Sequence, residues 1–140
     1  MRLIYALFIL IISIATPSTC QENAEEWLER GNELFGQGDY EEAIEAYDES
    51  LRLDSENPVT WSNKGTALIN QRRYDEAIQA FDEVIRRDPE LASAWSYKGG
   101  ALHELGEYDE AIVALDQAIV LEPENGSIWS LKGSALYFQE

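Results

Sequence analysis

The chain has 140 residues, and 45% of them are hydrophobic, so it has enough apolar side chains to bury a core and is not expected to be disordered. Asp and Glu number 27 against 10 Lys and Arg, which gives a formal net charge of -17. Because such a chain repels phosphate groups, we expect no nucleic-acid partner and no attraction to anionic membrane surfaces.

Residues 1–20 form a segment of a different kind. Arg2 precedes an almost unbroken apolar run that extends from Leu3 to Ala15. A helix needs about 20 apolar residues to span a membrane, whereas the apolar part of a signal peptide needs only about 7 to 15. We expect residues 1–20 to be a signal peptide cleaved after Cys20, or an N-terminal anchor that is left uncleaved or lipidated at Cys20.

In each case the remainder of the chain is predicted to be exported, and to be secreted, periplasmic or at the cell surface. Contact with a membrane is expected only through an uncleaved or lipidated N-terminus.

In residues 21–140 the same pattern of residue types recurs at a constant interval. Four tryptophans are evenly spaced along this part of the chain, namely Trp27, Trp61, Trp95 and Trp129. Four glycines and three alanine-isoleucine pairs follow the same interval: Gly31, Gly65, Gly99, Gly133, Ala43-Ile44, Ala77-Ile78 and Ala111-Ile112. The interval divides the domain into unit one (24–57), unit two (58–91), unit three (92–125) and a partial unit (126–140).

Within each unit the apolar side chains recur three and four residues apart, as in Trp61, Gly65 and Leu68, which is typical of an amphipathic helix. Glycines in the middle of units one and three then predict a tight turn and a second helix. Asp39 lies three residues before Glu42 and predicts a capping box for the second helix of unit one. Each unit is therefore expected to be a helix, a turn and a helix.

The chain from residue 24 to residue 140 resembles the tetratricopeptide repeat (TPR) family, whose pattern reads W-x2-L-G-x2-Y, then A-x3-F, then A, then P. The stretches "WLERGNEL", "WSNKGTAL", "WSYKGGAL" and "WSLKGSAL" carry the first part of this pattern. Leu115, Ser55 and Arg72 depart from it, at an aromatic, a proline and a turn-glycine position. The resemblance implies an all-α fold: a right-handed superhelical array of antiparallel helix pairs, with three full repeats plus one further helix.

The resemblance also implies a concave surface that binds proteins or extended peptides, formed by the first helix of each unit. On that surface we expect a peptide-binding groove that consists of Asn32, Phe35, Asn63, Thr66, Ile69, Asn70, Tyr97 and His103. Family members that hold the acidic C-terminal tails of heat-shock chaperones use two asparagines and three basic residues. Asn32 and Asn63 match the asparagines, but Leu28, Ser93 and Tyr97 stand at the basic positions, so we do not expect this chain to hold such a tail.

No catalytic, cofactor or metal site is expected. After the leader the chain has no cysteine and a single histidine, His103, which excludes Cys-His pairs, multi-histidine zinc sites and Ser-His-Asp triads. Neither a calcium-binding loop nor a phosphate-binding glycine loop occurs. We therefore expect a scaffold and not an enzyme.

Two alternatives to the peptide-binding scaffold remain open at this point. The last residues before Gln139 are apolar, namely Leu136, Tyr137 and Phe138. They favour a structural module that self-associates through its C-terminal helix, or a fragment of a longer repeat array.

Overall fold

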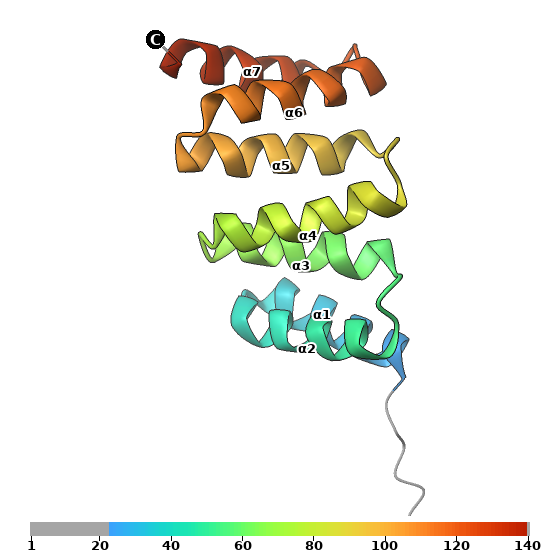
Figure 1. Cartoon of the computed structure of the whole chain (residues 1–140). Coiled ribbons are helices and arrows are strands. Elements are labelled where there is room, and N and C mark those ends of the chain that lie inside the picture. Colours follow the sequence, from blue (N-terminus) through green and yellow to red (C-terminus); the bar gives the residue numbers. More distant parts are fainter. Residues whose placement is uncertain (1–22, 140) are drawn as a thin grey trace, which may run out of the picture.

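Every segment with apolar side chains at helical spacing forms a helix in the computed structural model, which describes residues 23–139. These residues contain seven helices and no strand (Figure 1). The helices are α1 (Ala24–Gln37), α2 (Tyr40–Leu53), α3 (Pro58–Asn70), α4 (Tyr74–Arg87), α5 (Ala92–Leu105), α6 (Tyr108–Leu121) and α7 (Gly126–Phe138). The predicted signal peptide and its cleavage or lipidation at Cys20 lie outside the described residues.

The helices pack in adjacent pairs that are stacked along one direction (Figure 1). The first helices of successive units also touch, α1 with α3, α3 with α5 and α5 with α7, whereas among the described helices α2, α4 and α6 do not contact one another. The array therefore curves with the odd-numbered helices on its inner side. The predicted all-α solenoid of three helix pairs and one further helix is confirmed.

The two helices of a unit approach closely where a glycine faces a large side chain. A Cβ atom added at Gly65 would lie 2.8 Å from Cζ of Phe81, and one added at Gly99 would lie 2.7 Å from Cγ of Leu115. Phe81 and Leu115 are fully buried, so neither has free space to move into. The repeated glycine is thus required by the packing between the helices.

In units two and three a tryptophan connects the first helix to the loop before it. The indole N–H of Trp61 donates to the carbonyl of Ser55 at 2.8 Å, and that of Trp95 donates to the carbonyl of Pro89 at 2.9 Å. Asparagine side chains cap the N-termini of α1 and α3. Asn23 forms a capping box with Glu26, and Asn57 accepts from two backbone N–H groups of α3.

The capping box predicted at Asp39 is wrong. Asp39 precedes α2 but its side chain makes no capping hydrogen bond. Its backbone N–H donates instead to the carbonyl of Leu34 at 3.0 Å, because Gly38 turns the chain left-handed at φ 89° and ends α1. The two-residue turn leaves Asp39 with ψ 67° in place of the extended conformation that a capping side chain needs.

No helix within residues 23–139 has both the length and the apolar content that crossing a membrane requires.

Candidate functional site

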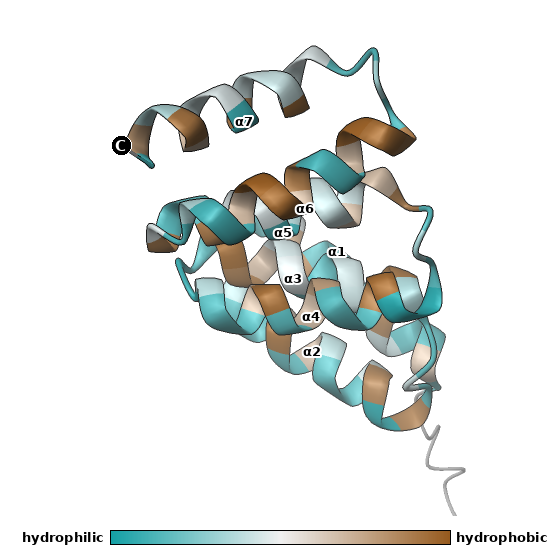
Figure 2. Ribbon diagram, turned by 45° about the horizontal axis from the view of Figure 1, so that its top comes forward, coloured by the Kyte–Doolittle hydropathy of each residue, from teal (hydrophilic) through white to brown (hydrophobic). Residues whose placement is uncertain are grey.

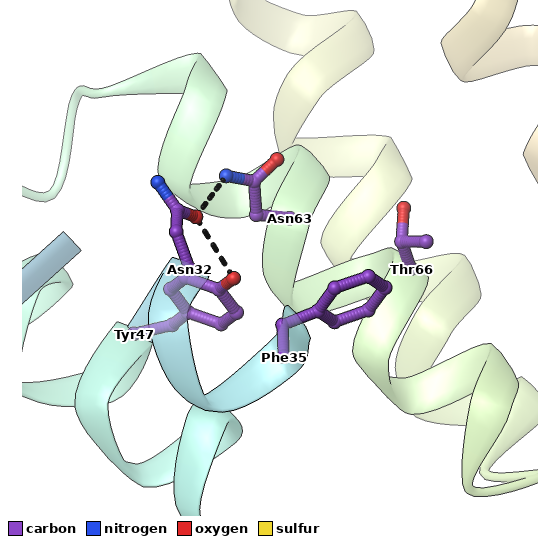
Figure 3. A pocket seen from close by; sticks show the side chains of 5 residues that line it. All are labelled: Asn32, Phe35, Tyr47, Asn63 and Thr66. Carbon is purple, nitrogen blue, oxygen red and sulfur yellow. Dashed lines mark hydrogen bonds between the residues drawn. The ribbon is translucent and has the colours of Figure 1, made fainter. Parts of the chain in front are cut away.

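A small pocket opens on the inner side of the array where α1 meets α3 (Figure 3). Its volume is about 150 Å³, and its lining combines two amides, two aromatic rings and one hydroxyl: Asn32, Phe35, Tyr47, Asn63 and Thr66. Four of these residues come from the first helices of units one and two, and Tyr47 reaches in from α2. The pocket therefore joins two units.

Asn32 accepts two hydrogen bonds that tie three helices together. Its Oδ1 atom accepts from Nδ2 of Asn63 at 2.8 Å and from the hydroxyl of Tyr47 at 3.0 Å (Figure 3). Two polar groups of the pair remain without a hydrogen bond to the described residues, namely Nδ2 of Asn32, a donor, and Oδ1 of Asn63, an acceptor. A peptide backbone offers the matching acceptor and donor.

Tyr47 belongs to the core and to the site at once. Its side chain is 1% exposed, and burial raises the pKa of its phenol to about 12. The hydroxyl is therefore protonated at neutral pH and available as a donor. Sequence analysis did not place Tyr47 in the groove because its position is an aromatic packing position of the repeat. The hydroxyl of Tyr47 is the feature that could have identified it as a site residue, because Phe81 and Leu115 at the equivalent positions have none.

Phe35 and Thr66 complete the pocket. The ring of Phe35 meets the ring of Tyr40 edge to face, with 5.3 Å between centroids, which holds it at the end of α1. The hydroxyl of Thr66 donates to the carbonyl of Ser62 within its own helix at 3.0 Å. These two residues thus supply an aromatic wall and a small polar wall.

The other four residues predicted for the groove do not line this pocket. Ile69 packs against the core, and Nδ2 of Asn70 donates to a carbonyl of its own helix at 2.9 Å. Tyr97, which is 44% exposed, stacks on Phe81 with 5.2 Å between ring centroids. His103 lies 2.9 Å from the hydroxyl of Ser134 in α7, in contact with the rings of Tyr108 and Phe138. The pocket thus brings together Asn32, Phe35, Asn63 and Thr66.

No cationic side chain of residues 23–139 lines the pocket. Leu28 packs against the core, Ser93 is exposed, and Tyr97 is uncharged. The lysines of the first helices pair instead with aspartates of the preceding unit, Lys64 with Asp48 at 2.5 Å and Lys98 with Asp82 at 2.6 Å. Within residues 23–139 there is no group of three or more His, Cys, Asp or Glu that could hold a metal ion.

Two family models match the chain. A model described as a tetratricopeptide repeat matches residues 62–127, and one described as a TPR repeat matches residues 31–72. No curated protein matches the chain closely enough to count as a relative.

Solved TPR domains superimpose on the array. The first TPR of Spaghetti (RPAP3), bound to the HSP90 peptide SRMEEVD, gives a TM-score of 0.78 at 26% identity, with 84% of this chain and 94% of that chain covered. The TPR2B domain of yeast Sti1 in its pHsp70 complex gives 0.75 at 29% identity, with coverage of 81% and 96%. The second TPR of Spaghetti (RPAP3), bound to the same HSP90 peptide, gives 0.68 at 30% identity, with coverage of 72% and 94%.

Proposed function

Because this chain belongs to the tetratricopeptide repeat family, we propose that it is a non-catalytic scaffold that binds an extended segment of another protein in the groove between α1 and α3. The observation that carries the proposal is the amide pair of Asn32 and Asn63 at the pocket. Similar solved domains hold peptides from HSP90 and from Hsp70, which supports a peptide as the class of ligand.

The amide pair suits a peptide in extended conformation. Nδ2 of Asn32 can donate to a peptide carbonyl, and Oδ1 of Asn63 can accept from a peptide N–H. Tyr47 and the amide-to-amide bond hold both side chains in place before the ligand arrives, so less conformational entropy is lost on binding. Phe35 provides a surface for one apolar side chain of the ligand.

The charge of the groove favours a neutral or basic segment as ligand. The peptide SRMEEVD carries two glutamates and a C-terminal aspartate, so a protein that holds it has to balance negative charge. In this chain the pocket has no cation, and the whole molecule carries a formal charge of -17. An acidic tail would lose its hydration without gaining a cationic partner.

A peptide library without acidic bias, displayed on phage and selected on this protein, tests the proposal. We expect the selected peptides to bind the variant with both Asn32→Ala and Asn63→Ala about 30-fold more weakly, because about 2 kcal/mol of hydrogen bonding is lost. Asn70→Ala is the matched control, since Asn70 donates only to its own helix, and its affinity should stay within about twofold of the original.

Stability has to be followed in the same experiment. Asn32→Ala leaves the buried hydroxyl of Tyr47 without its acceptor, which costs about 1 to 2 kcal/mol of unfolding free energy. Affinity should therefore be measured at a temperature where circular dichroism shows both variants to be folded. Equal affinity of the folded double variant, or tighter binding of SRMEEVD than of the selected peptides, would contradict the proposal.

Export of this scaffold is a separate part of the proposal, supported by the apolar leader of residues 1–20 alone. Mass spectrometry of the protein from its native host should find an N-terminus at or near Gln21. An intact Met1 on protein from the cytosolic fraction would refute export.

A further inference from the structure

A second groove, on the outer side of unit three, is lined mainly by apolar side chains. Its volume is about 440 Å³, and the three helices α4, α5 and α6 contribute to it. The apolar part of its lining consists of Ile78, Trp95, Leu102, Val113 and Ala114. Because α4 and α6 both pack against α5, and α6 also packs against α7, all walls of this groove lie within the array. It shares no residue with the pocket between α1 and α3.

The corresponding grooves of units one and two are charged. Their volumes are similar, about 500 Å³ in unit one and about 420 Å³ in unit two. Val113 occupies the position of Glu45 in unit one. It is 64% exposed, so unit three presents an apolar side chain to solvent where unit one presents a carboxylate. The second helices of units one and two line their grooves with Glu42, Glu45, Glu49, Glu76 and Glu83.

The apolar surface continues from the groove along α6. Val120 is 76% exposed and lies seven residues after Val113, which places both on one face of the helix, with Gln117 between them. Figure 2 shows brown, hydrophobic stretches along α6. We call Val113, Gln117 and Val120 the α6 face, and it carries no charge. The other two complete units have salt bridges at the positions of Gln117 and Val120, which join Glu49 to Arg52 at 2.8 Å and Glu83 to Arg86 at 3.2 Å.

Negative charge without a cationic partner lies beside the groove. Glu110 lines the groove, is exposed, and makes no ion pair within residues 23–139. In unit two the equivalent Glu76 pairs with Arg73 at 2.7 Å, but unit three has Glu107 at the position of that arginine. Lys98 is the cation of the lining, and its Nζ is already held by an aspartate of α4 at 2.6 Å. A positive charge on a ligand would therefore find unpaired carboxylates next to an apolar wall.

We propose that the groove and the α6 face together dock an amphipathic helix of another protein, with lysine or arginine beside its apolar stripe. Two apolar residues seven apart on such a helix would span the distance of about 10 Å from Val113 to Val120, because each residue adds about 1.5 Å of helix rise. One of them would enter the groove beside Trp95. A basic residue next to it would pair with Glu107 and Glu110.

The charge of the molecule argues against a second copy of the chain as the occupant. Each of the helices α2, α4 and α6 carries two acidic residues in its first turn, and the formal charge of the chain is -17. Contact between two copies would bring carboxylates together, and an anionic membrane surface would be repelled for the same reason. A basic helix is the occupant whose charge complements this surface.

A set of synthetic helical peptides tests the proposal. Each peptide has one apolar stripe and is cross-linked on the opposite side so that it stays helical, and the residues beside the stripe are varied among lysine, glutamate and serine. We expect saturable binding to the full chain by the lysine peptides. In nitrogen-15 spectra they should shift the signals of the α6 face and of the Trp95 indole, and leave those of Asn32 and Asn63 in place.

Val113→Glu combined with Val120→Arg is the decisive variant. It gives unit three the residues that unit one has at these positions, Glu45 and Arg52, and both sites are exposed, so the melting temperature should not change. Affinity for the lysine peptides should fall at least about tenfold, because the apolar contact is lost while the net charge stays the same. Val59→Glu is the matched control, since Val59 is an exposed valine of α3 outside the groove, and affinity should stay within about twofold.

Glu110→Gln isolates the contribution of charge. Affinity for the lysine peptides should fall about threefold or more at low salt, and it should depend less on salt concentration, because one charge pair is lost. Glu42→Gln, at the same position in unit one, should change neither the affinity nor its salt dependence.

Four outcomes would overturn the proposal. They are absence of saturable binding, a preference for the glutamate or serine peptides, unchanged affinity of the Val113 and Val120 double variant, and shifts in the α1 and α3 signals in place of α6. A dimer in sedimentation experiments that the double variant abolishes would assign the α6 face to a second copy, which also overturns it. Because this groove and the pocket between α1 and α3 share no residue, failure of either test leaves the other proposal intact.

Discussion

At the scale of single residues, Tyr47 links the core to the groove. Its ring packs against Gly31 in the core of unit one, and its hydroxyl holds Asn32 at 3.0 Å. The equivalent residues of units two and three, Phe81 and Leu115, pack in the same place without a hydroxyl. Among the complete units, unit one is therefore the one in which this core side chain holds an amide in place.

Tyr47→Phe should separate these two contributions. The ring stays in place, as Phe81 does in unit two, so only the hydrogen bond to Asn32 is lost. We expect the free energy of unfolding to fall by about 0.5 to 1.5 kcal/mol, and the affinity for groove peptides to fall because Asn32 is held less firmly. Urea denaturation and peptide titration measure the two effects. A variant that is less stable but binds equally well would show that Tyr47 serves the core alone.

Tyr47 should also make the stability of the folded protein depend on pH. Burial raises the pKa of Tyr47 from 10.0 to about 12, so the folded state holds the phenol proton more tightly than the unfolded state does. The stability that this provides is complete below about pH 10 and is lost as the pH rises through about 12, by about 2 to 3 kcal/mol in total. Unfolding measured between about pH 9 and about pH 12 should show a steeper loss for the original protein than for Tyr47→Phe.

At the scale of helices and turns, the turn between the two helices of a unit is made by glycine in units one and three and by arginine in unit two. Gly38 and Gly106 end the first helices of units one and three in the left-handed region, at φ 89° and 81°. Arg72 adopts φ 58° at the corresponding place in unit two, where a side chain is sterically unfavourable. The surrounding hydrogen bonds, from Arg72 to Ile69 and from Arg73 to Leu68, force this conformation on it.

Arg72→Gly is therefore expected to stabilise the protein. Relief of the left-handed conformation should raise the free energy of unfolding by about 0.5 to 1 kcal/mol, measured as a higher urea midpoint with an unchanged slope. Gln71→Gly is the control, because Gln71 has φ -85° and gains nothing from glycine, so it should destabilise. A lower midpoint for Arg72→Gly would mean that the arginine side chain contributes more than the strain costs.

At the scale of the whole molecule, negative charge outweighs the ion pairs. The formal charge is -17, and several of the cations already have carboxylate partners, such as Lys64 with Asp48 and Arg73 with Glu76. The remaining carboxylates repel one another across an array only two helices thick. Folding has to overcome this repulsion through the apolar contacts between neighbouring units.

Sodium chloride should therefore raise the melting temperature. Salt screens the repulsion over distances of about 10 Å or more at 0.1 M, and the acids outnumber the bases too far for the weakened surface ion pairs to reverse the sign. We expect a gain of about 4 °C between about 20 mM and about 500 mM salt, which calorimetry can measure. A decrease would show that the ion pairs between units dominate the electrostatics.

The sequence by itself determined the solenoid, the family and the core positions, because a constant repeat interval and a helical spacing within it are properties of the chain order. Trp61, Gly65 and Leu68 can be assigned to one helix face without knowing any partner. The sequence also identified Asn32 and Asn63 as residues of interest, through the family pattern.

Only the tertiary structure decided which side chains meet. The pocket joins Asn32, Tyr47 and Asn63 from three helices, and their distances depend on how far each helix is rotated and shifted against the next, which spacing along the chain does not encode. For the same reason Tyr97 and His103 do not line the pocket, and the backbone N–H of Asp39 donates to a carbonyl at the end of α1. Gly31, Gly65 and Gly99 are equivalent in sequence, yet only the structure shows what each one faces, namely Tyr47, Phe81 and Leu115.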